Sequence, residues 1–187
     1  LDPAFFGFTD ADQETVFDTS NTFFGKNNMS LRELLNALRE TYCGTIGAEY
    51  MYTTEQAEKR WWQQKLESIR SKPNFTAEKK KQILDRLTAA EGLERYLHTK
   101  YVGQKRFSLE GGESFIAAMD ELIQSAGAQG VQEVVIGMAH RGRLNVLVNT
   151  MGKRPADLFA EFDHTAPEDL PAGDVKYHQG FSSDVST

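Results

Sequence analysis

Hydrophobic positions recur with helical spacing soon after residue 30. Ser30 and Glu33 have the form of a capping box, in which each side chain bonds a backbone N–H near the other residue. The leucines that come next lie at i, i+3, i+4 and i+7, which is the spacing of one helix face: Leu31, Leu34, Leu35 and Leu38. The pattern predicts an amphipathic helix that ends near Cys43-Gly44.

Two more helices are expected before residue 100. The first starts at Thr53 with Gln56 and stops before Pro73, because the residue before a proline disfavours helix. Its apolar stripe contains Trp62, Leu66 and Ile69, and Trp61 and Trp62 are assigned to packing rather than to a cofactor site. The second is capped by Thr76, carries Ile83, Leu84 and Leu87, and extends toward Leu97. The three helices are expected to form one small helical group.

The first 29 residues lack a clear period. They are acidic and contain six scattered phenylalanines: Phe5, Phe6, Phe8, Phe17, Phe23 and Phe24. Because so many aromatic side chains need burial, we expect an extended arm packed on a larger body.

The pattern changes after Arg106. A helix is predicted with five inward residues and an end at Gly127. The inward residues are Phe115, Ile116, Met119, Leu122 and Ile123. Residues 134–136, Val-Val-Ile, then indicate a strand buried on both faces, as in a parallel sheet covered by helices. A helical pattern begins at Leu144, another runs from Pro155 to Phe162, and residues 174–178 indicate a second strand or its end.

The order helix, strand, helix predicts an α/β fold for the second half. The predicted fold class is therefore α/β, with a small helical amino-terminal domain before the first part of an α/β domain. We place the domains at residues 1–72, the arm and helices, and 73–187, the α/β part.

Composition narrows the functional classes. The chain is 40% hydrophobic and 26% charged, and its formal net charge of −6 argues against nucleic acid as a partner. The single Cys43 excludes an internal disulfide, and no apolar run approaches the roughly 18 to 20 residues of a membrane span. A cytoplasmic setting fits best. Since the chain starts with Leu1 and lacks a natural-looking end, we expect a piece of a longer protein.

Candidate chemistry gathers at the carboxyl end of the predicted strand. His140, Arg141 and Arg143 surround Gly142, just before a helix. Ligands bind at this edge of open α/β sheets, and guanidinium groups beside a helix start favour an anion. An arginine at such a turn also often caps a carbonyl or pairs with a glutamate, so both interpretations stay open. His178 is the second histidine that comes after an apolar run.

Several other chemistries do not fit. The spacing of Gly137 and Gly142 matches a phosphate-binding P-loop, but Arg143-Leu144 stands where Lys-Ser/Thr is needed. No dinucleotide-binding glycine motif, nucleophile elbow or zinc-like spacing of Cys and His occurs. We assign no metal ligand in this chain.

Several motifs together resemble those of the 2-oxoglutarate dehydrogenase family, specifically its thiamine diphosphate-dependent decarboxylating component of the bacterial type. They are Glu110-Gly111-Gly112-Glu113, residues 137–147 (GMAHRGRLNVL) and residues 173–180 (GDVKYHQG). Residues 41–44, 47–51 and 88–94 are similar to the helical segment of the family. The resemblance covers nearly the whole chain.

The resemblance implies an enzyme that decarboxylates 2-oxoglutarate and transfers the succinyl group to a lipoyl arm of a partner acyltransferase. This is an oxidoreductase of the tricarboxylic acid cycle, a homodimer within a multienzyme complex. The implied cofactors are thiamine diphosphate and Mg²⁺, with the metal ligands beyond Thr187. The chain is then an amino-terminal fragment, inactive alone.

The resemblance also assigns roles to single residues. Arg141 contacts the cofactor, while His140 and His178 are catalytic and line the substrate pocket. Ser182 adds a polar contact to the substrate. Arg143, Gly142 and Asn145 match the motif, and a structural role in holding the turn is an equal alternative for them. Two other functions stay open: a paralogue that acts on 2-oxoadipate, and a non-catalytic helical module that docks the acyltransferase.

Overall fold

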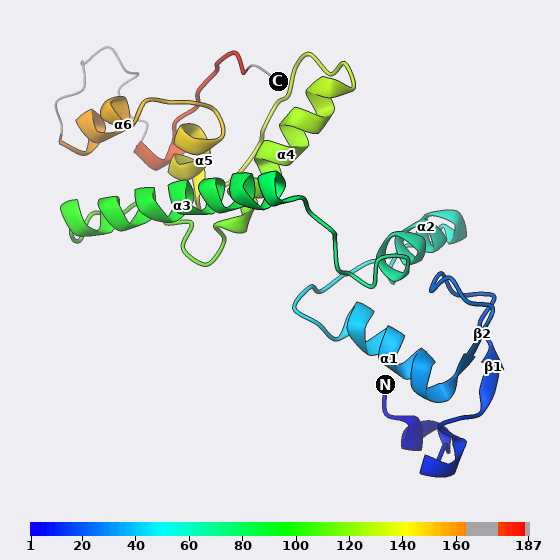
Figure 1. The fold of residues 1–187 in the computed structure, drawn as a ribbon. Coiled ribbons are helices and arrows are strands. Elements are labelled where there is room, and N and C mark those ends of the chain that lie inside the picture. The colour runs from blue at the N-terminus through cyan, green and yellow to red at the C-terminus, as the bar shows by residue number, and fades with distance from the viewer. Residues whose placement is uncertain (164–175, 186–187) are drawn as a thin grey trace. The chain divides into compact units, whose positions relative to one another are not determined.

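The computed structural model describes residues 1–163 and 176–185, in two units, Leu1–Phe75 and Thr76–Thr187 (Figure 1). Each unit is a part of the chain that packs mainly with itself in this structure. The assignment of residues 1–72 and 73–187 to separate domains of the complete protein stays a prediction.

The first 30 residues contain short elements where a simple extended arm was expected. Two 3-10 helices, η1 (Pro3–Phe6) and η2 (Asp10–Asp12), precede a hairpin of β1 (Val16–Asp18) and β2 (Asn28–Ser30). The strands are antiparallel, with Val16 opposite Ser30. Phe5 and Phe6 are 82% and 68% exposed, so the expected burial of the aromatic side chains does not hold for these two.

Helix α1 (Leu31–Tyr42) confirms the predicted capping box. The Ser30 hydroxyl accepts from Glu33 N at 3.2 Å, and the Glu33 carboxylate accepts from Ser30 N at 3.1 Å. The hydrogen bond from Lys26 is the main cause that lowers the pKa of Glu33. Leu31 and Leu35 are buried, and the helix ends at Tyr42, next to the predicted Cys43.

Helix α2 (Gln56–Glu67) begins after Glu55, without the predicted cap at Thr53. Trp61 and Trp62 meet edge to face at 4.8 Å but are 48% and 39% exposed, so the prediction that they are core residues is wrong for this unit. Their helix instead attaches through Glu67, at its end.

Glu67 is the buried residue that links α2 to the rest of the first unit. Its carboxylate accepts from Phe23 N at 2.9 Å, in the hairpin loop, and from the Tyr42 hydroxyl at 2.8 Å, on α1. Burial is the main cause that raises the pKa of Tyr42, and hydrogen bonds with Tyr50 and Glu67 add to it. The neutral phenol therefore persists as a donor to the carboxylate.

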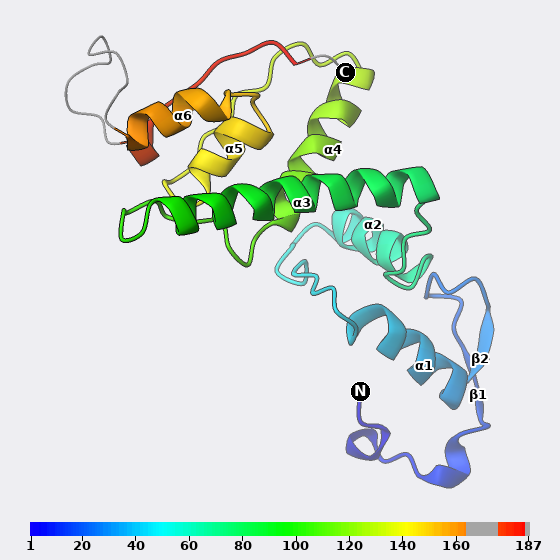
Figure 2. The same cartoon turned by 60° about the vertical axis from the view of Figure 1, so that its left-hand side comes forward.

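Helix α3 (Ala77–Lys100) is the axis of the second unit. It starts at the predicted cap, where the Thr76 hydroxyl accepts from Lys79 N at 3.2 Å. The helices α5 (Arg143–Asn149) and α6 (Pro155–Phe162) lie on one side of α3 in both views, and α4 (Ser114–Ala128) crosses α3 (Figure 2). Because α3 packs with these helices, the expected grouping of α3 with α1 and α2 is wrong.

Two apolar clusters hold the second unit together. The larger joins α3, α5 and α6 through Leu93, Leu97, Tyr101, Leu144, Leu158 and Phe162. The smaller joins α3, α4 and α5 through Ala90, Ile116 and Val146. Of the inward residues predicted for α4, Ile116 and Met119 are buried, whereas Phe115 and Leu122 are 40% and 57% exposed.

Residues 131–139 are extended but are not a strand of a sheet. Val134 and Val135 are 45% and 94% exposed, which contradicts the predicted burial on both faces. A strand of a parallel sheet needs neighbouring strands as well as covering helices, and the described part of the second unit offers only helices. Lys176–His178 likewise form a 3-10 helix, η3, where a strand was expected; residues 174 and 175 lie outside the described residues.

The fold class is α/β, with a helical amino-terminal part followed by the helix, extended segment and helix that begin an α/β domain. Within the described residues, the single sheet is the β1–β2 hairpin. None of the helices described has the length and apolar character required to cross a membrane.

Two substitutions on α4 test the packing of the second unit. Ile116 is fully buried, so Ile116→Ala should lower the free energy of unfolding of the 187-residue chain by about 2 to 5 kcal/mol. Leu122→Ala, on the exposed face, should change it by about 0.5 kcal/mol or less. Denaturant unfolding measures both, and equal losses would contradict the burial of one face of α4.

Candidate functional site

Gly142 sets the geometry of the turn that carries the candidate site. It adopts φ +72°, in the left-handed region, and precedes the first residue of α5. A Cβ atom at this position would lie 2.6 Å from Leu109 Cδ1, well inside van der Waals contact. Gly142 N donates to Phe107 O at 2.9 Å. The left-handed backbone and the close approach of Leu109 together favour glycine at position 142.

Arg143 acts as a clamp between segments. Its Nη1 donates to the carbonyl oxygens of His178 at 2.7 Å and Gln179 at 3.2 Å, and its Nη2 donates to Met138 O. Its Nε is buried and has no partner in the described structure. Since carbonyls take up the outer guanidinium donors, the structural alternative is the one that the geometry of Arg143 supports.

Asn145 has a similar structural role. It is fully buried, and its Nδ2 donates to Ala90 O at 2.9 Å and to Glu94 Oε1 at 3.1 Å. Its Oδ1 accepts from Asn149 Nδ2 at 2.7 Å. These bonds fix α5 against α3, directly behind the turn.

The Glu94 carboxylate, which accepts from Asn145, also fixes the loop before α4. Glu94, 3% exposed, accepts from Leu109 N at 3.0 Å and from Arg106 Nε at 3.4 Å. Between these two residues, Phe107 adopts φ +49°, an unusual value for a residue with a side chain. Such backbone strain persists only where the surroundings impose it, and it often accompanies a functional site.

Phe107 belongs to a cluster of four rings that brings the two candidate histidines together. Its ring lies 3.9 Å from the His140 ring, and the centroids of His140 and His178 are 5.7 Å apart. Tyr177 closes the cluster, 4.9 Å from Phe107 and 5.2 Å from His178. Lys105 Nζ lies 4.7 Å from the centroid of the Phe107 ring.

Sequence reasoning singled out neither Phe107 nor Tyr177 as a site residue. Tyr177 lies next to His178 in a quoted motif, which was a signal. For Phe107 the sequence gave no such signal, because His140, whose ring it contacts, is 33 positions away along the chain.

Arg141 differs from Arg143 in its surroundings. It is exposed, and its Nη1 donates to Ser108 O at 3.3 Å. Among the described residues its other guanidinium N–H groups have no protein partner. Arg141 therefore offers donors to an anion beside His140, whereas Arg143 does not.

The cleft that Ser182 lines does not include His140 or His178 among its described lining residues. This open cleft of about 440 Å³ lies between residues 134–138 and 179–183, and Arg143 also borders it. No contact described in the structure joins Ser182 to His140 or His178. Its predicted substrate contact stays a prediction.

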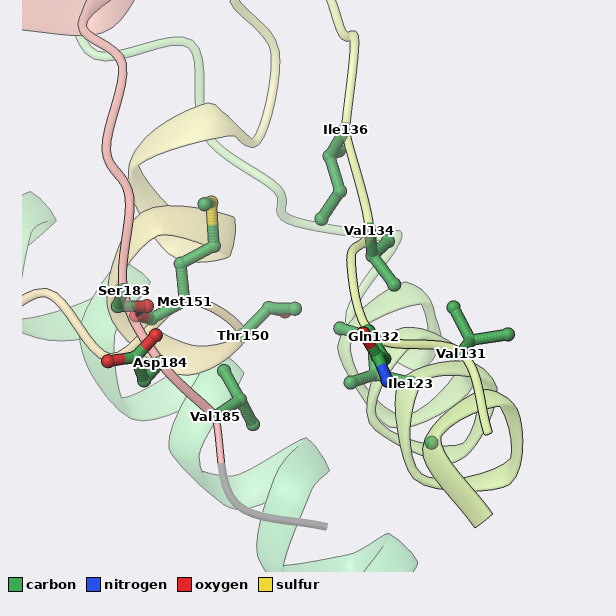
Figure 3. A pocket seen from close by; sticks show the side chains of 11 residues that line it. Ile123, Val131, Gln132, Val134, Ile136, Thr150, Met151, Ser183, Asp184 and Val185 are labelled. Carbon is green, nitrogen blue, oxygen red and sulfur yellow. Dashed lines mark hydrogen bonds between the residues drawn. The ribbon is translucent and has the colours of Figure 1, made fainter. Parts of the chain in front are cut away.

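A second cleft, of about 200 Å³, continues along the same extended segment (Figure 3). Val134 and Ile136 lie on one side of it, and Met151, Thr150 and Ser183 lie on the other. The Thr150 hydroxyl is buried and has no hydrogen-bond partner among the described residues. In residues 1–163 and 176–185, no cluster of three or more His, Cys, Asp or Glu side chains could hold a metal ion.

The fold and the site define a class: an α/β protein in which a histidine and an exposed arginine follow an extended segment just before a helix, and a second histidine from a later segment lies beside the first. No family model matches the chain. Curated relatives do. The chain is 79% identical over all of its 187 residues to a 2-oxoglutarate dehydrogenase E1 component of Cupriavidus necator, and covers 20% of that protein.

Two further relatives have the same name. One, from Azotobacter vinelandii, is 56% identical over 97% of the chain and 19% of the relative; another, from Haemophilus influenzae, is 50% identical over the whole chain and 20% of the relative. The chain is thus similar along nearly its whole length to 2-oxoglutarate dehydrogenase E1 components, and it spans about one fifth of the length of the curated relatives it matches.

Gly142→Ala should destabilise the chain through two separate effects. The left-handed backbone costs an alanine about 1 to 2 kcal/mol, and the contact with Leu109 adds about 1 to 3 kcal/mol. Gly130→Ala is the control, because Gly130 has φ +90° but open space at the Cβ position. Denaturant unfolding should show the larger loss for Gly142→Ala, and added Leu109→Ala should remove part of the excess. Equal losses at the two glycines would contradict the close approach.

Proposed function

We propose that the chain is part of an enzyme that decarboxylates 2-oxoglutarate on thiamine diphosphate. The enzyme passes the succinyl group to a lipoyl arm of a partner acyltransferase. The observation that carries the proposal is the pairing of the His140 and His178 rings beside the exposed Arg141, in a chain 79% identical to a 2-oxoglutarate dehydrogenase E1 component.

Thiamine diphosphate, when bound, supplies the carbon nucleophile and the electron sink that allow carbon dioxide to leave a 2-oxo acid. The residues present fit one part of such a cofactor. Arg141 has guanidinium donors without a protein partner among the described residues, which suit the oxygens of a diphosphate. We propose no metal ligand in this chain for Mg²⁺, and Mg²⁺ enters the proposal through the family alone.

The two histidines have surroundings that suit different tasks. His140 is half-buried against the Phe107 ring, which fixes the plane of its imidazole; a fixed donor suits charge that develops on the substrate oxygen. His178 is exposed at the end of η3, with its carbonyl held by Arg143. We assign it to the distal carboxylate of 2-oxoglutarate, since an imidazole can donate from either nitrogen.

The rest of the proposal rests on the family. The complete enzyme is a homodimer of the cytoplasm, acts in the tricarboxylic acid cycle and belongs to a multienzyme complex. Ser182 adds a polar contact to the substrate. The alternative is a paralogue that prefers the longer 2-oxoadipate. No described residue distinguishes the two acids by their chain length.

A second candidate function concerns the first unit alone. Trp61 and Trp62 expose 48% and 39% of their surface, and Phe5 and Phe6 expose more. Exposed aromatic residues are typical of interaction surfaces. This exposure favours a docking role for the first unit toward the acyltransferase or the second protomer, alongside catalysis.

Arg141→Ala in the complete enzyme tests the cofactor assignment. Loss of charge-assisted bonds worth about 1.5 to 3 kcal/mol should weaken thiamine diphosphate binding by roughly ten- to a hundredfold. Selectivity between 2-oxo acids should change little. Calorimetric titration with the cofactor and Mg²⁺ measures the affinity.

Arg154→Ala is the matched control for that experiment. Arg154 is also exposed, but it pairs with Asp157 on its own helix, which lowers the pKa of Asp157. Its removal should leave cofactor affinity unchanged. An unchanged affinity for Arg141→Ala as well would give Arg141 a structural role.

His178→Ala and His140→Ala separate the substrate roles in the complete enzyme. His178→Ala should lower kcat/KM for 2-oxoglutarate by roughly ten- to a hundredfold, because a bond to a charged carboxylate is lost. Pyruvate has no distal carboxylate and should be affected much less. His140→Ala should slow both acids alike. Steady-state kinetics on both acids decides, and equal losses for His178→Ala would refute its assignment.

A further inference from the structure

A buried ion pair lies behind the segment that carries His178. Lys153 comes just after the end of α5 and is 8% exposed. Its Nζ donates to Glu161 Oε1, on α6, at 2.6 Å and to Gln179 Oε1 at 2.7 Å. Gln179 is the residue next to His178. The ammonium group thus bridges α6 and the histidine segment.

This pair is a poor device for stability alone. Its two side chains are 10% and 8% exposed, and burial of two charges costs free energy that their attraction offsets only with complete hydrogen bonding. The second oxygen, Glu161 Oε2, is buried and has no partner in the described structure. The free-energy cost of burying these charges is therefore only partly offset. The specific structural effect of the pair is the hydrogen bond from Lys153 to Gln179.

Gln179 and His178 are also held through their backbone carbonyls. Arg143 Nη1 donates to both of their backbone carbonyls, at 3.2 and 2.7 Å. Lys176 Nζ, whose pKa is lowered chiefly by burial, donates to Gln104 Oε1 at 2.8 Å. Three cationic side chains thus anchor residues 176–179.

The His178 side chain is the part of this segment left exposed. The side chains of Lys176, Tyr177 and Gln179 are half-buried and make contacts with the rest of the unit, while His178 faces solvent beside the His140 ring. An anchored backbone with one free imidazole is the arrangement expected where a side chain must meet a ligand in a fixed position.

We propose that Lys153, held by Glu161, is a positioning residue: through Gln179 it fixes the His178 imidazole and so sets the preference for dicarboxylic over monocarboxylic 2-oxo acids. The inference rests on the proposed role of His178 as the reader of the distal carboxylate. It adds a determinant of selectivity that does not itself touch the substrate.

The experiment uses the complete enzyme with the paired substitution Lys153→Met and Glu161→Leu. Replacing both partners of a buried ion pair with apolar residues of similar volume is often neutral or stabilising, so the fold should persist. Gln179→Met is the second variant, because it removes the acceptor and leaves the ion pair in place. The control is Arg154→Met with Asp157→Leu, an exposed ion pair at the start of α6.

Two readouts are taken for every variant. Backbone hydrogen exchange of a peptide that spans residues 176–182 should be faster in the double variant and in Gln179→Met than in the control. In both, KM for 2-oxoglutarate should rise roughly tenfold, less than the ~10²-fold effect of a 1 Å misplacement. KM for pyruvate should change little.

Three results would overturn the inference. Unchanged exchange in residues 176–182 would mean that Lys153 does not hold the segment. Faster exchange with an unchanged KM for 2-oxoglutarate would make the pair structural only. Equal rises in KM for both acids would exclude a role in selectivity. Failure of the proposed function is distinguished separately: it appears as equal losses on both acids for His178→Ala, while the exchange result does not depend on substrate.

Discussion

The second unit depends on one buried carboxylate. Glu94, on α3, accepts from Asn145 on α5 and from the backbone N–H of Leu109 in the loop before α4. A buried carboxylate must find donors, because an unpaired charge in the interior costs more than any single contact returns. Arg106 supplies a further donor from the same loop. The side chain therefore fixes the two segments whose contact creates the site.

The contact between these segments leaves the turn little freedom. With the Leu109 backbone held by Glu94, Gly142 passes against the Leu109 side chain, and a side chain at position 142 would require the Leu109 side chain to move. The tight turn brings the His140 ring onto Phe107, which has a positive φ in the same loop. The position of His140 therefore depends on how the neighbouring segments pack on α3. The function proposed for this site would therefore depend on the packing of the core around α3.

Local signals in the sequence predicted local structure well. The caps at Ser30 and Thr76 rest on neighbours within a few residues, so the local sequence specifies them. The helical spacing also placed Ile116 on a buried face, although its partners on α3 and α5 are far away in the chain. The strand at 134–136 needs neighbours that the described residues do not supply, and it remains an exposed extended segment. The helical spacing of Trp62 likewise indicates which face is apolar but not what covers it.

The sequence identified several residues of the candidate site better than it identified their roles. The motif brought attention to His140 and His178, and the two rings do lie together. The roles of Lys153 and Phe107 depend on partners 26 and 33 positions away in the chain, a separation at which sequence spacing carries no information. Burial and hydrogen bonding supply it instead.

Arg141 and Arg143, the two arginines of the motif, have the same side chain but different surroundings. Both guanidinium groups can bind an anion, and residue type alone does not separate them. Arg143 meets three backbone carbonyls from two segments, so its charge compensates backbone dipoles and joins the extended segment to His178. Arg141, two positions earlier, faces solvent with most of its donors free among the described residues. Of the two, Arg141 is the one that keeps exposed donors, as its proposed contact with an anionic ligand beside His140 requires.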